Sequence, residues 1–284
     1  MLYLRDKLTN DKNMTRTSFA GLDLKSPIIV GSNSQTASID KILEFESAGA
    51  GAVALKSLFQ ESIEREIASA VSDEHPEAND YISAYVGARA LEDYVNLIKT
   101  AKSRVSIPVI ASIACNTDGK WEEFSKTIEQ AGADALELNV MSLCTARNGK
   151  PGDFEQMHID IEKMSFTTGD PFTNASDLAS NLRWAGIVSA SVKKLDVAVS
   201  GGVQGWEGIV KSVLCGAAAV EVASAIIRNG AKWITEANEG LSAWMKGKSF
   251  GAIADFRGKM NASDPENADK LFRTQFLKYF SSVH

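Results

Sequence analysis

Three short phrases of the sequence echo one another, and they constrain the fold more than any other feature. AGAGAVALKS begins at Ala48, AGADALELNV at Ala131 and CGAAAVEVAS at Cys215. Each has the pattern of a helix end, a turn with glycine and a short apolar strand. Such strands, recurring between helical segments, predict a parallel β/α architecture. Repetition of the unit favours a barrel over a doubly wound sheet.

Six strands can be read along the chain, at 27–30, 52–55, 108–113, 135–140, 195–199 and 218–222. Helical patterns occupy 39–48, 91–105, 121–131, 178–192, 207–214 and 234–245. A closed barrel of this type has eight strands. The shortfall lies between residues 152 and 191, where 154–161 reads as helical and 162–173 as polar and turn-rich. We therefore predict an α/β fold of the TIM (β/α)8 type that is incomplete, with strands 5 and 6 not found.

The domain organisation follows from the length of 284 residues, which suits one large β/α-barrel domain over 1–284. The polar stretch 59–84 is too long for an ordinary connection, so we expect an inserted, lid-like segment there. A C-terminal tail is expected over 247–284.

Composition excludes several classes of partner. The net charge is -6 and no long basic run occurs, so we expect neither a nucleic-acid partner nor a membrane partner. The three cysteines and three histidines have no metal-ligand spacing, which predicts no metal site. The sequence has no signal-peptide core and no apolar run of membrane-spanning length, so we expect a soluble, cytoplasmic protein.

Polar residues follow most of the predicted strands, where a parallel barrel places its active site. They are Ser32, Asn33, Lys56, Ser57, Ser112, Asn139, Ser200, Gly201, Ala223 and Ser224. The cation of Lys56 suits an anionic reduced flavin or a carboxylate substrate; alternatively, it pairs with a carboxylate of the barrel. The amide of Asn139 suits a planar heterocycle; alternatively, it caps the next helix.

The turns after the last two predicted strands predict a phosphate site. Gly201 and Gly202 follow one strand, and Ala223 and Ser224 follow the next. Barrels often bind phosphate at this place through bare backbone N–H groups, and glycine lets the backbone approach the anion. We expect a cofactor or substrate that carries a phosphate.

Two residues of the loop after the fourth predicted strand could act as a catalytic base. They are Ser142 and Cys144, and each needs a tuned pKa for that role. Alternatively, Cys144 is a small buried hydrophobic residue and Ser142 an ordinary loop hydroxyl. His158 falls in the helix-like stretch and is not expected to be catalytic.

Taken in order, these segments resemble the dihydroorotate dehydrogenase family, above all its soluble, FMN-dependent class 1 members. The resemblance lies in SPIIVGSN, GAGAVALKS, ELNV, SGGVQGWEGIVKSVLCGAAAVEVASAI and AIADFRGKM. It covers most of residues 18–260, and the last two segments are its most specific parts.

The resemblance implies FMN as cofactor and oxidation of dihydroorotate to orotate, in the biosynthesis of pyrimidines and UMP. It also implies that the following residues contact the cofactor: Gly31, Ser32, Lys56, Ser57, Ser112, Asn139, Gly201, Gly202, Ala223 and Ser224. Lys56 and Asn139 would also contact the substrate. A soluble electron acceptor such as fumarate and a homodimer are implied in the same way.

The sequence departs from the family pattern in two places. The residue aligned with the catalytic cysteine is Ser142, whereas a shift of two residues would place Cys144 there. A βαβ piece of roughly 40–60 residues is missing, about a fifth of such a barrel. The alternatives are therefore a non-catalytic flavin- or phosphate-binding remnant, and a barrel lyase or aldolase that uses Lys56 as its Schiff-base amine.

Overall fold

A computed structural model describes residues 14–71, 76–115, 118–139, 157–160, 165–168 and 172–280. Its centre is a seven-stranded parallel sheet in the order β10-β11-β3-β4-β6-β5, with β7 paired to β6. The strands are β3 (Ile28–Val30), β4 (Ala52–Ala54), β5 (Leu58–Phe59), β6 (Val109–Ala114), β7 (Ala135–Leu138), β10 (Ala198–Ser200) and β11 (Ala219–Val222). β4 and β5 both pair with β6, so they are two parts of one interrupted strand. The six predicted strands are thus confirmed.

The sheet does not close into a barrel within the described residues. Its edges are β7 and β10, which pair with β6 and β11 respectively and with no other described strand. In barrel order these edges are strands 4 and 7, so the opening lies where strands 5 and 6 were not found. The prediction of an incomplete TIM-type barrel is confirmed.

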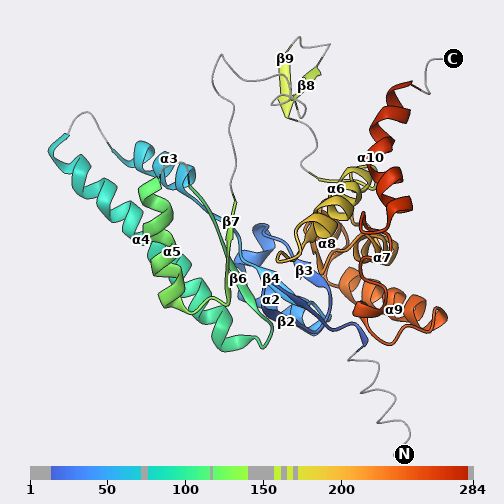
Figure 1. Ribbon diagram of the computed structural model, residues 1–284. Helices are drawn as coiled ribbons and strands as arrows, with labels where there is room; N and C mark the ends of the chain where they lie inside the picture. The colour runs from blue at the N-terminus through green and yellow to red at the C-terminus, as the bar shows by residue number, and fades with distance from the viewer. Residues whose placement is uncertain are drawn as a thin grey trace, which may run out of the picture.

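The prediction of a helix over 154–161 is wrong. Met157–Asp160 forms strand β8, which pairs antiparallel with β9 (Ser165–Thr168). The two strands form a separate hairpin, which Figure 1 draws apart from the main sheet. The physical reason is visible in Met-His-Ile-Asp, where apolar and polar residues alternate with the period of a strand rather than of a helix. His158 therefore lies on a strand.

Helices cover the outer side of the sheet, and Figure 1 shows α3, α4 and α5 on one flank and α6 to α10 on the other. The helices predicted from sequence correspond to α2 (Ile39–Ser47), α4 (Pro76–Arg104), α5 (Asp118–Ala131), α6 (Leu178–Ser191), α7 (Trp206–Leu214) and α9 (Lys232–Gly247). The sequence did not predict α3 (Gln60–Ala70), α8 (Ser224–Asn229) and α10 (Pro265–Phe280). The stretch 59–84 contains α3 and the first part of α4, which pack against each other.

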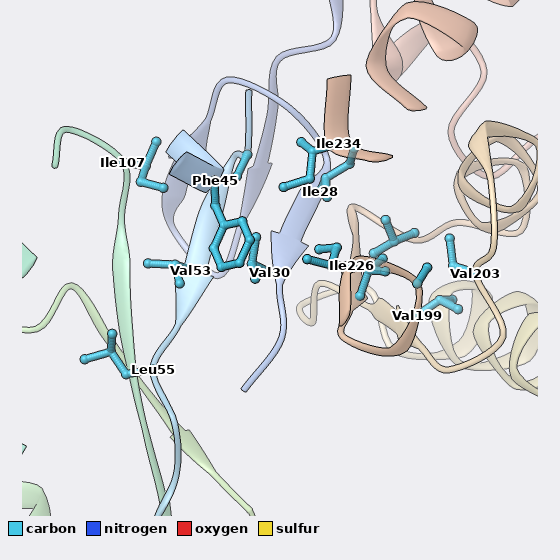
Figure 2. Close-up of a cluster of buried hydrophobic side chains, with 14 of the residues drawn as sticks. Ile28, Val30, Phe45, Val53, Leu55, Ile107, Val199, Val203, Ile226 and Ile234 are labelled. Atoms are coloured by element: carbon cyan, nitrogen blue, oxygen red, sulfur yellow. The ribbon is translucent and has the colours of Figure 1, made fainter. Parts of the chain in front are cut away.

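Two hydrophobic layers follow from the alternation of side chains along each strand. Outward-facing residues such as Ile28, Val30 and Val53 meet the helices in a large core, shown in Figure 2 with Phe45 of α2. Inward-facing residues form a smaller core from Leu24, Ile29, Ala52, Ala54, Ile110 and Ala219. The hairpin of β1 (Thr17–Phe19) and β2 (Leu22–Leu24) packs against this inner layer at the amino ends of the strands.

No helix of the described residues combines the length and the apolarity that a membrane span needs. Among the same residues, no group of three or more histidine, cysteine or acidic side chains is arranged to hold a metal ion.

Candidate functional site

An open cleft of about 620 Å³ lies at the carboxyl ends of the strands. The residues that line it lie on or just after six of the seven strands: Ser32, Asn33, Ser34, Lys56, Ser57, Phe59, Glu137, Leu138, Asn139, Ser200 and Glu221. On the inner face of the sheet, the apolar residues of the smaller core lie toward the amino ends of the strands, and the polar residues lie toward the carboxyl ends. The cleft therefore has a polar lining and opens above the smaller apolar core on the inner face of the sheet.

Four side chains on neighbouring strands form a continuous hydrogen-bonded row. Ser32 and Ser57 lie with their hydroxyl oxygens 2.9 Å apart, and those of Ser57 and Ser112 are 2.7 Å apart. The Ser112 hydroxyl donates to a carboxylate oxygen of Glu137 at 2.6 Å. The row thus ties together the ends of β3, β4, β6 and β7.

Tyr94 of α4 fixes the position of Ser112. Its hydroxyl donates to the Ser112 carbonyl at 2.9 Å and accepts from the Ser112 N–H at 2.7 Å. Burial raises the pKa of Tyr94, so the phenol stays neutral. Ser112 is fully buried and is absent from the cleft lining, so it supports the cleft from below.

Lys56 and Asn139, the two predicted contacts for both cofactor and substrate, both line the cleft. The Lys56 side chain is exposed and forms no ion pair with any carboxylate in the described part of the chain. The alternative that Lys56 forms an ion pair with a carboxylate of the barrel therefore finds no support among the described residues. Asn139 continues β7, because its N–H donates to the Ile113 carbonyl at 2.8 Å, and its side chain caps no described helix.

Glu221 lies between Val220 and Val222 of β11 and faces the interior. Burial raises its pKa to about 7, and the negative charge of Glu137 raises the pKa further, while a hydrogen bond from the Ser32 backbone opposes both effects. Gly31 makes room for this side chain, since a Cβ there would lie 2.8 Å from a Glu221 carboxylate oxygen. Gly31 thus serves the packing of Glu221.

The predicted phosphate turns come together in a second, smaller pocket of about 130 Å³. Gly201, Gly202, Ala223 and Ser224 all line it, and it shares Ser200 and Glu221 with the larger cleft. Gly201 and Gly202 have φ angles of 88° and 80°, which favour glycine. At Gly202 a Cβ would lie 2.3 Å from the Leu178 backbone nitrogen, so no larger residue fits.

Thr173 closes one side of this smaller pocket. Its N–H donates to the Ser224 hydroxyl at 3.1 Å, and its carbonyl accepts from the Gln204 amide at 3.0 Å and from Arg228 at 3.2 Å. The segment that enters the helix α6 is thereby held against the turns after β10 and β11.

Two of the predicted site residues lie outside the described part of the chain, and two acidic residues of the cleft were not predicted from the sequence. Ser142 and Cys144, the candidate bases, lie outside the described part of the chain. Glu137 and Glu221 were not singled out, although each is a single charge inside a short apolar strand, in ALEL and AVEV. A lone acid in such a strand is rarely buried without a purpose, and this was the available signal.

Comparison with known proteins gives a consistent set of relatives, although no family model matches the chain. A protein from Aeropyrum pernix, named as dihydroorotate dehydrogenase A (fumarate), is 27% identical over 206 residues, which are 54% of this chain and 67% of the relative. Catalytic subunits of dihydroorotate dehydrogenase B (NAD(+)) from Thermococcus kodakarensis and Methanothermobacter thermautotrophicus are 25% and 26% identical. These two matches cover 59% and 57% of this chain, and 52% and 50% of the relatives.

The extent of these matches agrees with a shortened chain. The chain spans about half the length of two relatives and two thirds of the third. A stretch of 206 residues would be nearly three quarters of 284, yet the first match covers 54%, so part of it has no counterpart here. The chain is thus similar to three proteins that are named as dihydroorotate dehydrogenases, and its open β/α sheet agrees with that similarity.

Proposed function

We propose that this chain is an FMN-dependent oxidoreductase acting on a CH–CH bond, which oxidises dihydroorotate to orotate in pyrimidine and UMP biosynthesis. The observation that carries the proposal is the pairing of a polar cleft of about 620 Å³ with a glycine-walled pocket of about 130 Å³ that shares two of its residues. A flat heterocycle joined to a phosphate needs two such compartments side by side.

The residues present fit FMN. The backbone at Gly201, Gly202, Ala223 and Ser224 would hold the phosphate, because bare turns expose N–H groups to an anion. Ser32, Lys56 and Asn139 would hold the ring system in the cleft, with Ser57 and Ser112 fixing Ser32 from behind. When bound, FMN supplies the acceptor for a hydride.

The remaining roles follow from the chemistry of the reaction, in which dihydroorotate loses a proton from one ring carbon and a hydride from the next. Lys56 would stabilise negative charge that accumulates at the ring system, since it is a cation of the cleft lining that forms no ion pair with a described carboxylate. Asn139 would orient the substrate ring by its amide. We assign the base to Ser142 or Cys144. A cytoplasmic homodimer with a soluble electron acceptor completes the proposal.

The visible spectrum of the purified protein, before and after anaerobic dihydroorotate, tests this function. We expect flavin absorbance that bleaches with the substrate. The Lys56→Ala and Asn139→Ala variants should lose at least about tenfold in turnover, because each removes a contact to the reacting ring. Lys99→Ala, on the exposed side of α4, is the matched control and should keep wild-type turnover. Unchanged turnover in the two cleft variants would refute this assignment of the site.

A non-catalytic, flavin-binding remnant is the second candidate, and the edges β7 and β10, which have no outer partner among the described strands, favour it. The same spectrum separates the two. Bound flavin that dihydroorotate does not bleach would select the remnant, whereas absence of flavin after reconstitution with FMN would exclude both.

A further inference from the structure

The floor of the cleft carries two carboxyl groups whose surroundings differ. Glu137 points inward from β7 and Glu221 from β11, and both line the cleft. They interact electrostatically, because the charge of Glu137 raises the pKa of Glu221. Neither forms an ion pair within the described residues.

The row of serines holds Glu137 as a hydrogen-bond acceptor. Each hydroxyl has one proton to donate. Ser112 donates its proton to Glu137, so the proton between Ser57 and Ser112 must come from Ser57. The proton between Ser32 and Ser57 then comes from Ser32, whose oxygen also accepts from the Ser57 N–H at 2.9 Å. All three hydroxyls are therefore oriented toward Glu137, whose carboxylate oxygen accepts the last hydrogen bond of the row.

Glu221 has the opposite environment. It is enclosed between β3 and β10, and its carboxylate lies against the bare backbone of Gly31. The titratable groups that share the cleft with it are Glu137 from β7 and Lys56 from the end of β4, while the ends of β3 and β10 contribute uncharged residues such as Ser32 and Ser200. Burial raises its pKa to about 7, so this carboxyl is largely protonated below pH 7 and still partly protonated at pH 7. The cleft floor thus offers one acceptor, Glu137, and one donor, protonated Glu221.

We propose that protonated Glu221 and Glu137 together recognise the imide edge of the bound heterocycle, with Glu221 donating to a ring carbonyl and Glu137 accepting from the adjacent ring N–H. Glu221 is then a specificity-determining residue of the site. This inference rests on the proposed function and names the ligand edge that the cleft selects. Flavin rings and dihydropyrimidines both carry such an edge, so either the cofactor or the substrate can be its source.

The test is the pH dependence of ligand binding. In the wild-type protein, the dissociation constant for FMN should rise between pH 7 and 9, approaching about tenfold per pH unit, because ionised Glu221 cannot donate. In Glu221→Gln, which keeps a donor of similar size and cannot titrate, it should stay constant. Glu239→Gln, an exposed residue of α9, should behave like wild type. FMN methylated at the imide nitrogen should bind at least about tenfold more weakly than FMN.

A parallel titration of the FMN-loaded protein with orotate separates the two sources. If orotate rather than FMN shows the pH dependence that Glu221→Gln abolishes, the substrate supplies the edge. If wild type binds both ligands with no pH dependence, or Glu221→Gln keeps the wild-type dependence, the role of Glu221 is overturned while the proposed function stands. If wild type binds neither FMN nor orotate, the proposed function and this inference fail together.

Discussion

Single acidic residues inside short apolar strands carry much of the chemistry at the scale of the residue. In Ala-Val-Glu-Val the two valines face the outer helices, so the alternation turns Glu221 inward. The same rule turns Glu137 inward from Ala-Leu-Glu-Leu. The position of Lys56 and Asn139 directly after strands was enough to predict that both line the cleft. It did not identify the two acids, because the conclusion that they meet requires β7 and β11 to curve toward a common interior.

The raised pKa of Glu221 should make the free energy of unfolding depend on pH. Its pKa is about 7 in the folded protein, above the ordinary value of 4.5, so the folded state binds the proton more tightly than the unfolded state. Relative to Glu221→Gln, the wild-type unfolding free energy should fall as pH rises from about 4.5 to 7, by on the order of 3 kcal/mol at most, and then level off.

Urea unfolding of both proteins at pH 5, 6, 7 and 8 would measure this difference. Glu239→Gln provides the control, since an exposed carboxylate should leave the wild-type profile in place. Parallel profiles for wild type and Glu221→Gln would mean that Glu221 is ionised throughout.

The three repeated phrases differ at the scale of the element, although their strands are equivalent. The residue just before each strand is Gly51 in the first phrase, Asp134 in the second and Ala218 in the third. Only the first must be glycine, because the Ser26 carbonyl passes beside it and a Cβ would lie 1.9 Å from that oxygen. The repeat predicts three strands but does not indicate which turn tolerates a side chain.

Two glycine substitutions should therefore act in opposite directions. Gly51→Ala should destabilise the protein by about 3 kcal/mol or more, since the backbone of Ser26 cannot move without disturbing β3. Gly87→Ala should stabilise it by about 0.5–1 kcal/mol, because Gly87 lies within α4 and a Cβ there meets nothing within 4 Å.

Thermal unfolding followed by circular dichroism would measure both variants against wild type. Gly87→Ala serves as the control for the chemistry of the substitution. Equal melting temperatures for Gly51→Ala and wild type would mean that the turn before β4 can rearrange.

At the scale of the whole molecule, the open edges of the described sheet are the feature that most affects association between chains. β10 ends the sheet on one side, and large apolar side chains near it are exposed: Trp184 of α6 by 55% and Leu195 by 62%. A groove of about 270 Å³ runs along α6 and β10 at this edge. Unpaired edges with apolar flanks promote association between chains.

Charged substitutions at this edge should reduce self-association. Trp184→Lys and Leu195→Lys are expected to lower the concentration-dependent apparent mass, with little loss of stability because both side chains are already exposed. Tyr81→Lys, on α4 and 74% exposed, is the control for adding a charge away from the edge. Sedimentation at several concentrations would measure the effect. Equal association in all four proteins would exclude this edge as the contact.

The local sequence pattern was enough to predict the six strands and six of the helices, because apolar periodicity and glycine turns act within a few residues. It also predicted an incomplete barrel, and the sheet of the described residues is open between β7 and β10. The prediction from the local pattern was wrong at β8, a short segment of alternating apolar and polar residues for which a helix was predicted. The serine row, the Gly31–Glu221 contact and the two joined pockets link residues far apart in the chain. Such contacts arise from the curvature and register of the sheet, and local patterns carry no record of them.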